Sequence, residues 1–201
     1  MRIRNLYRGS WLSNCYLVSE GSDAVVIDPS SSAEEIAAIL TEAGLTLRGI
    51  LLTHGHFDHI LSLDTLRDAT GACAYLHRGD GDFPADSGKS CYLGFLGRDI
   101  RHRAPEVLLE GGEVLTFGAL TFQVIHTPGH TGGCVCYRCG DSLFTGDTIF
   151  AEGYGRTDLP GGSWTALQES LSMLTGMQNE GLTIYPGHGP ACPLAEAAAR
   201  L

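Results

Sequence analysis

The sequence predicts an α/β fold in which helices are layered on sheets, and three observations support this class. Residues 49–52 form a nearly all-apolar run, as expected of a strand that is covered on both faces. Residues 33–43 place apolar side chains at helical spacing, so helix-like and strand-like segments alternate in the first part of the chain. The length of 201 residues is enough for one sizeable core, and we expect one domain over residues 1–201.

Each element is expected for a local reason. The helix over residues 33–43 begins at a capping box, because the Ser32 hydroxyl can accept a first-turn N–H and Glu35 can return the bond. A second helix is expected to start near residue 58 and to end at Gly71, and Ser163 can cap a last long helix. Strands are expected at the apolar runs between turn residues, over 14–18, 24–27, 49–52, 73–76, 107–109, 114–117, 120–125, 134–137, 142–144 and 182–185.

Residues 77–105 do not fit this pattern. The segment is rich in glycine and aspartate, with apolar side chains such as Phe95 and Leu96 interleaved. A long irregular segment in a compact domain is often a lid or a binding loop, and a surface excursion is the alternative. The alanine-rich tail over residues 194–201 is expected to form one or two helical turns.

The charge balance bounds the partners. The chain has 13 Lys and Arg against 23 Asp and Glu, a formal net charge of −10, which disfavours a protein that tracks phosphate backbones. No stretch is long and apolar enough to span a membrane, and residues 1–8 lack the apolar core of a signal peptide. We therefore expect a cytoplasmic protein without nucleic-acid or membrane partners.

The seven cysteines are an odd number scattered over the chain, and in a reducing cytosol they are expected to be small buried hydrophobes. Cys134, Cys136 and Cys139 could form a thiolate site for a metal. The alternation of Cys134, Cys136 and Arg138 also fits one face of a strand, which is the favoured interpretation.

The chemistry of the chain is concentrated in residues 53–59, directly after the apolar strand. His54, His56, Asp58 and His59 place three imidazoles and a carboxylate within seven residues. Such groups would repel and desolvate one another if they were buried without a cation. Imidazole and carboxylate are natural ligands of divalent metals, so the stretch predicts a metal site.

Three further candidate ligands follow strand-like runs directly. They are His130 in Thr-Pro-Gly-His, Asp147 in Gly-Asp-Thr, and His188 in Pro-Gly-His-Gly. Glycine beside a ligand lets the backbone turn sharply and approach an ion. His54 and His56, two residues apart, can reach one ion, whereas the adjacent Asp58 and His59 suit a second. Seven candidates exceed what one tetrahedral zinc uses and fit two ions that share a carboxylate.

This order of ligands resembles the metallo-β-lactamase superfamily of hydrolases. The His-x-His-x-Asp-His motif, followed by His, Asp and His at these intervals, is highly specific, and the resemblance covers nearly the whole chain. It implies a four-layer αβ/βα sandwich, with two mixed sheets, helices outside and the metals at one edge. The chain departs from the usual pattern at Ile60-Leu61-Ser62, where members often have a glycine pair.

The resemblance also implies a ligand set. His54, His56 and His130 would bind one ion, Asp58, His59 and His188 a second, and Asp147 would bridge them. Zinc is the expected metal, with iron or manganese as alternatives. The other three histidines match no ligand position and are expected to be structural or at the surface, with His126 close enough to support a ligand: they are His77, His102 and His126.

Residues 146–162 are similar to the glyoxalase II group, the hydroxyacylglutathione hydrolases, and especially to its short bacterial form. Arg156 stands where classical members have a lysine that grips a glutathione carboxylate, and Arg156 and Tyr154 are therefore the expected substrate-binding residues. A salt bridge of Arg156 to Asp158 or Glu152 is the alternative. The helical C-terminal extension that helps classical members hold glutathione is expected to be missing, because the chain ends soon after His188.

The implied activity is metal-assisted hydrolysis of a thioester such as S-lactoylglutathione, a small-molecule substrate. Asp58 is the expected catalytic residue, which orients the attacking water and accepts its proton. The same Gly-Arg-Thr-Asp run over 155–158 is equally similar to persulfide dioxygenases, a mono-iron branch, so a dioxygenase is the first alternative. A lactonase or β-lactamase is the second, and a non-catalytic metal-binding module, which would have lost ligands, is a distant third.

Overall fold

The computed structural model, which describes residues 1–6 and 12–201, contains two six-stranded sheets. The first sheet has the order β1-β2-β3-β4-β5-β6, and its strands are β1 (Arg2–Asn5), β2 (Tyr16–Glu20), β3 (Asp23–Ile27), β4 (Thr46–Leu51), β5 (Ala74–His77) and β6 (Val107–Leu109). The second has the order β12-β11-β10-β9-β8-β7, and its strands are β7 (Val114–Phe117), β8 (Leu120–His126), β9 (Val135–Cys139), β10 (Ser142–Gly146), β11 (Thr183–Pro186) and β12 (Cys192–Pro193).

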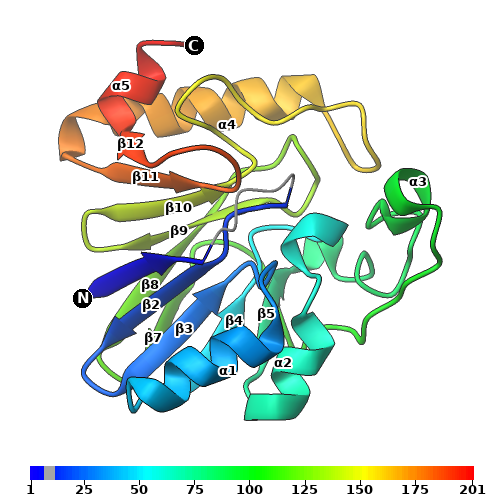
Figure 1. Ribbon diagram of the computed structural model, residues 1–201. Coiled ribbons are helices and arrows are strands. Elements are labelled where there is room, and N and C mark those ends of the chain that lie inside the picture. Colours follow the sequence, from blue (N-terminus) through cyan, green and yellow to red (C-terminus); the bar gives the residue numbers. More distant parts are fainter. Residues whose placement is uncertain (7–11) are drawn as a thin grey trace.

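Helices cover the outer face of each sheet (Figure 1). The first sheet carries α1 (Ala33–Glu42) and α2 (Leu63–Thr70), and the second carries α4 (Trp164–Gly176) and α5 (Leu194–Ala198). A five-residue helix, α3 (Tyr92–Leu96), lies apart from both layers, and short 3-10 turns span Phe57–His59, Arg78–Asp80 and Gln178–Glu180. The arrangement is the expected αβ/βα sandwich of two mixed sheets.

Three apolar clusters fill the spaces between these layers. They form on both faces of the sheets because successive side chains of a strand point to opposite faces. Val26 packs toward α1 and α2, whereas its neighbours Val25 and Ile27 belong to the cluster between the two sheets. Leu167 and Leu171 of α4 pack on the outer face of the second sheet. The strand periodicity therefore sets which residues join the sheets and which hold the helices.

The helix boundaries follow the expected signals. The Ser32 hydroxyl accepts a hydrogen bond from the Glu35 N–H at 3.2 Å, and Ser163 caps α4 in the same way through the Ala166 N–H at 3.4 Å. Gly71 ends α2 with a φ of 71°, a conformation that costs glycine little.

Some boundaries differ from the expectation. The first long strand begins at Tyr16 rather than at residue 14, because Asn14 instead bonds to the Pro186 and Gly189 carbonyls, both at 2.9 Å. The second helix begins at Leu63, since residues 57–59 form a separate 3-10 turn. The strand expected over 134–137 spans Val135–Cys139, and the strands β1 and β12 were not expected.

Parallel pairing brings the candidate site together. The strands β3, β4 and β5 are parallel neighbours, so their carboxyl ends meet at one edge of the first sheet. The strands β10 and β11 are the parallel pair of the second sheet and deliver residues 147 and 188 from their carboxyl ends. The chain segments after these strands carry most of the candidate ligands. Among the described residues, no helix combines the length and the apolar character needed to cross a bilayer.

Candidate metal centre

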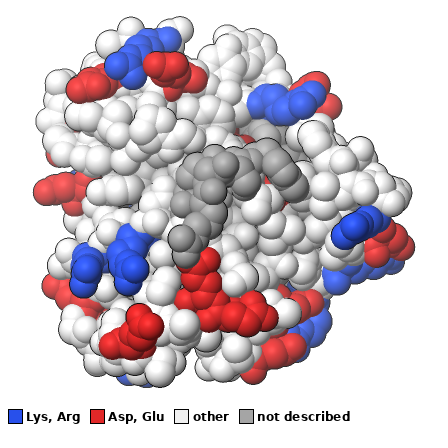
Figure 2. All heavy atoms as spheres, viewed as in Figure 1, with Lys and Arg blue, Asp and Glu red and all other residues white. Residues whose placement is uncertain are grey.

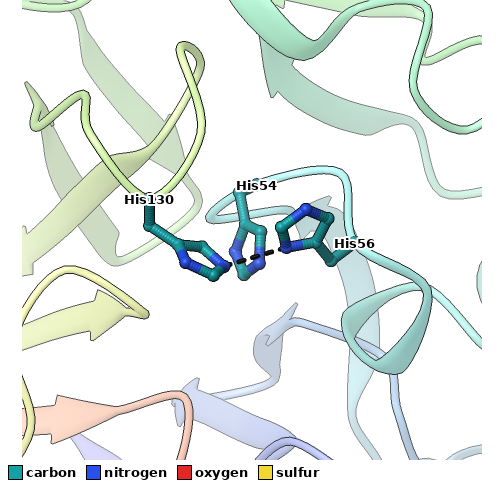
Figure 3. A group of neighbouring side chains, drawn as sticks. All are labelled: His54, His56 and His130. Atoms are coloured by element: carbon teal, nitrogen blue, oxygen red, sulfur yellow. Dashed lines mark hydrogen bonds between the residues drawn. The ribbon is translucent and has the colours of Figure 1, made fainter. Parts of the chain in front are cut away.

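All seven candidate ligands lie together at this edge. Each of three overlapping groups places its ligand atoms within 4.8 Å of one another. The groups are His54, His56 and His130; His54, His59 and Asp147; and Asp58, His59 and His188. Figure 3 shows the first group, in which the rings of His54 and His56, after β4, point toward His130 from the loop after β8.

Buried atoms without partners show that the cluster fits cations. Nε2 of His54, Nε2 of His59 and Oδ1 of Asp147 are buried and have no hydrogen-bond partner. Nδ1 of His56 lies 2.9 Å from Nε2 of His130, so two ring nitrogens that are both acceptors in the metal-binding state face each other (Figure 3). Unpaired buried polar atoms are costly, and a metal ion between them would satisfy several at once.

The charge states of His54, His56 and Asp147 suit the same role, whereas nearby carboxylates raise the pKa of His59 and His188 despite their burial, so these two rings would give up a proton on binding a metal. Burial lowers the pKa of His54 well below its usual value, and burial together with His130 lowers the pKa of His56 to about 3, so both imidazoles stay neutral. Burial opposes ionisation of Asp147, but the nearby His59, His130 and His188 outweigh it and hold its pKa below the usual range. Neutral imidazoles and an ionised carboxylate are the forms that bind metals.

Asp28, at the end of β3, positions two of the candidate ligands. Its carboxylate accepts hydrogen bonds from the Thr53 N–H at 2.8 Å and the Thr53 hydroxyl at 2.7 Å, and lies 2.9 Å from Nδ1 of His59. Nε2 of His59 is thereby left facing Asp147, at 3.4 Å. The Thr53 hydroxyl in turn lies 3.1 Å from Nδ1 of His54. Asp28 has a φ of 52°, an unusual conformation for a residue other than glycine.

Asp80 ties the two loops of the first group together. Its fully buried carboxylate accepts hydrogen bonds from the Gly55 N–H at 3.0 Å, between His54 and His56. It also accepts from the Thr131 hydroxyl at 2.6 Å and the Gly133 N–H at 2.8 Å, next to His130. Burial raises the pKa of Asp80, against the effect of these donors.

Asp28 and Asp80 were not among the residues expected at the site. Both lie after a strand of the first sheet: Asp28 follows β3 directly, and Asp80 is the last residue of the 3-10 turn after β5. An acid at the carboxyl end of an apolar strand was therefore a signal available in the sequence, because parallel neighbours end at the same edge.

Close backbone packing holds the remaining ligands. Nδ1 of His130 donates to the Arg156 carbonyl at 2.7 Å, which fixes the ring and leaves Nε2 for the cluster. A Cβ atom on Gly187 would lie 2.2 Å from Oδ1 of Asp147 and 2.7 Å from Cε1 of His59. Glycine is thus needed beside His188 for the chain to pass so near the other candidates.

A cavity of about 650 Å³ opens on the candidate ligands. Its lining includes five of them, together with Arg156 and a set of apolar side chains described below. The Arg156 guanidinium is exposed and pairs with both carboxylate oxygens of Asp158 at 2.6 Å, as the alternative interpretation expected. The Tyr154 ring packs against Trp164, 5.2 Å between centroids, and Tyr154 is not part of the lining.

The three remaining histidines have other partners. His77 and His126 stack at 3.9 Å between ring centroids, and Nε2 of His126 lies 3.0 Å from the Gly132 carbonyl. His102 pairs with the Tyr92 hydroxyl at 2.8 Å. The expected support of a ligand by His126 is therefore not among its contacts in the structure, and Asp28, Thr53 and the Arg156 carbonyl make those contacts instead.

On the face in Figure 2, some charged side chains lie in small groups of mixed sign, and a group at the lower centre is acidic alone. Pairs of mixed sign include Arg138 with Glu180 at 2.6 Å and Lys89 with Asp82 at 2.5 Å. The seven cysteines are free, and Cys136 and Arg138 lie in β9, as the strand interpretation expected, with Cys134 just before it. Five of the cysteines are buried, but Cys73 is exposed and Cys192 is partly exposed, so the expectation of buried cysteines is wrong for these two.

Comparisons with known proteins agree with this geometry. The family model of the Metallo-beta-lactamase superfamily matches residues 8–188. The probable metallo-hydrolase YqgX of Bacillus subtilis (strain 168) is 32% identical over 192 residues, covering 94% of this chain and 91% of that protein. The crystal structure of BLEG-1 B3 metallo-beta-lactamase has a TM-score of 0.90 at 34% identity, covering 97% of this chain and 95% of its own.

A second solved structure, TTHA1623 in a di-iron-bound form, has a TM-score of 0.85 at 35% identity and covers 97% of this chain and 96% of its own. The match of the family model over most of the chain, the identity to YqgX and the shared fold lead to one assignment. The chain belongs to the metallo-beta-lactamase superfamily of metal-dependent hydrolases.

Proposed function

We propose that the protein is a dinuclear metal-dependent hydrolase of thioesters. The observation that carries the proposal is the overlap of the donor groups around His54, His59 and Asp147, which joins two potential ion sites into one centre. The centre opens on a cavity large enough for a small-molecule substrate.

The donor set assigns each residue a place. His54, His56 and His130 would hold one ion, Asp58, His59 and His188 the other, and Asp147 would bridge them. Zinc is the proposed metal, with iron and manganese as alternatives, because imidazole and carboxylate accept all three. When bound, the two ions supply Lewis acidity and lower the pKa of water at the centre.

Asp58 is the proposed catalytic residue. Its carboxylate is partly exposed to the cavity and lies 3.2 Å from Nε2 of His188. The pKa of Asp58 is lowered, because His59 and His188 outweigh the opposing effect of burial, so the carboxylate is ionised and can accept a proton. A thiol leaving group, with a pKa of about 8.5, needs little acid assistance, which favours thioesters over amides at a centre without a further proton donor.

Hydroxyacylglutathione is the proposed substrate type. Arg156 lies at the cavity, where its guanidinium could hold a glutathione carboxylate in place of Asp158. Tyr154 lies on the same segment as Arg156 but does not line the cavity. Its proposed part in substrate binding is therefore indirect and acts through Arg156. The similarity to a B3 metallo-beta-lactamase favours β-lactam hydrolysis as the second candidate.

The test is hydrolysis of S-lactoylglutathione by purified protein, with metal counted per chain. Nitrocefin, a lactone and glutathione persulfide with oxygen uptake are assayed in parallel, so that the lactamase, lactonase and mono-iron dioxygenase alternatives each have a readout. Asp58→Asn should reduce thioester hydrolysis by 100-fold or more, on the order of the usual contribution of a general base. The matched control is Asp68→Asn, an exposed carboxylate paired with Arg103.

Oxygen uptake with one iron per chain would refute the hydrolase proposal, as would a fully metal-loaded protein that cleaves no thioester. Equal loss of activity in Asp58→Asn and Asp68→Asn would refute the role of Asp58.

A further inference from the structure

Part of the cavity lining is apolar, and its residues, here called the wall, come from three separate segments. Phe57 lies between the candidate ligands His56 and Asp58, Phe95 and Leu96 belong to α3, and Phe150 and Leu159 come from the segments after β10. The wall therefore begins at the metal centre and runs outward to α3.

Phe57 is buried, but the other wall residues are not fully packed against the protein. The rings of Phe57 and Phe95 stack at 5.5 Å between centroids, yet Phe95 remains 55% exposed. Leu96, Phe150 and Leu159 are only partly buried. An exposed phenylalanine beside a reactive centre marks a binding surface rather than core packing.

α3 presents this surface from the irregular segment over residues 77–105. The helix is bounded by two residues with positive φ, Cys91 at 67° and Gly97 at 63°, and is held by the bond of the Leu93 N–H to the Ser87 carbonyl at 2.9 Å. Cys91 itself lines the cavity. The segment thus contributes Cys91, Phe95 and Leu96 to the cavity lining, and its role as a binding loop stays a prediction.

The two halves of a thioester make different demands on such a cavity. The thiol half of a glutathione conjugate is a charged peptide and suits the exposed mouth, where Arg156 and Asp158 lie. The wall offers no hydrogen-bonding side chain and gains free energy only by covering apolar surface. The acyl half is the part of the substrate that the wall can recognise.

Resting on the proposed thioester hydrolysis, we propose that the wall of Phe57, Phe95, Leu96, Phe150 and Leu159 binds an apolar acyl chain, so that glutathione thioesters with longer apolar acyl chains are preferred over the short lactoyl group. Phe95 and Leu96 are then specificity-determining residues.

The test holds the thiol constant and changes the acyl chain. Acetyl-, butanoyl-, hexanoyl- and S-lactoylglutathione are compared on the metal-loaded protein, and kcat/KM should rise about two- to fourfold per added methylene, the value expected for burying each CH₂. Hexanoylglutathione should be preferred over S-lactoylglutathione by at least tenfold.

Binding is measured separately from turnover. The Kd of S-butyl- and S-hexylglutathione, which are thioethers and cannot be hydrolysed, is determined by calorimetry and should fall with chain length by a similar factor. Phe95→Ala should reduce the dependence of both kcat/KM and Kd on chain length. Phe150→Ala, a second variant on the segment after β10, should do the same. Leu93→Ala is the matched control, because Leu93 is 53% exposed on the same helix and does not line the cavity.

The outcomes separate the two proposals. If thioesters are cleaved but neither kcat/KM nor Kd depends on chain length, the apolar-acyl proposal is overturned and the hydrolase proposal stands. If no thioester is cleaved, the hydrolase proposal fails, and the thioether Kd series still decides whether the wall binds an apolar chain. Equal effects of Phe95→Ala and Leu93→Ala would also overturn the assignment of the wall.

Discussion

Replacing Asp80 with alanine should destabilise the protein and weaken the metal centre together. The change leaves two buried donors, the Gly55 N–H and the Gly133 N–H, without an acceptor, and it leaves the Thr131 hydroxyl with only the weak acceptor Sγ of Cys134 at 3.2 Å. Each hydrogen bond to a charged acceptor contributes about 1.5–3 kcal/mol, and relief of the buried charge offsets part of the sum. We expect a net loss of about 3–5 kcal/mol in the free energy of unfolding, a large share of the roughly 5–15 kcal/mol typical of folded domains.

The same change should loosen the loops that carry His54, His56 and His130, since Asp80 bonds to the backbone within or next to each of them. Loss of a group that orients ligands typically costs about 10- to 100-fold in metal affinity, and we expect this loss at the first ion. Urea unfolding of the metal-free protein measures stability, and competition with a chromophoric chelator measures affinity.

Two variants sharpen this test. Asp80→Asn keeps the size of the side chain but turns an amide NH₂ toward at least one donor, so its effect should be intermediate. Asp68→Ala removes an exposed carboxylate paired with Arg103 and should change neither quantity. The reasoning is refuted if the free energy of unfolding of Asp80→Ala lies within about 1 kcal/mol of that of the unaltered chain and both ions bind with unaltered affinity, since two unpaired buried N–H groups cost more than that.

Three further predictions concern the centre and its mouth. Gly187→Ala should displace Asp147 and His59, because its Cβ would lie 2.2 and 2.7 Å from them, and the variant should bind less metal. Gly176→Ala is the control, because nothing lies within 4 Å of its Cβ, and it should bind metal normally. Equal metal content in the two variants would contradict this prediction. Asp147→Ala should remove metal and activity together. Chelation of the unaltered protein should lower its Tm and zinc should restore it, since a metal ion at a free concentration of 100 times its Kd adds about 2.7 kcal/mol to the free energy of unfolding. Full activity of Asp147→Ala, or a Tm that chelation does not change, would argue against a bridging carboxylate. Arg156→Ala should raise the KM for S-lactoylglutathione. Asp158→Ala should lower this KM, because it frees the Arg156 guanidinium from its present partner. Unchanged KM values in both variants would show that Arg156 does not bind the substrate.

The α/β class and the gathering of most candidate ligands were predictable because both depend on local patterns, whereas the four-layer sandwich was expected from the resemblance to the superfamily. Apolar runs such as residues 49–52 mark strands, and ligand types directly after these runs lie at strand ends, which parallel pairing brings to one edge. The family assignment followed from the order and spacing of the histidines, which the family model confirms.

The supporting contacts were harder to predict because they depend on pairings distant in sequence. Asp28 meets His59 across 31 positions, and Asp80 meets Thr131 across 51. The strand β1 was missed because its residues are mostly exposed and do not show an apolar face. The ligand assignments, the single-domain organisation, the cytoplasmic location and the absence of nucleic-acid and membrane partners remain predictions.

The donors of each ion site are divided between the two halves of the chain. His54 and His56 come from the first sheet and His130 from the second, and the other ion would draw on Asp58 and His59 from the first and His188 from the second. An ion bound here would therefore hold together two separately hydrogen-bonded sheets. The first ion site cannot form before the ribosome has delivered residue 147, and the second cannot form before residue 188. Metal uptake would thus follow the docking of the two sheets and act as a checkpoint on assembly as well as a source of reactivity.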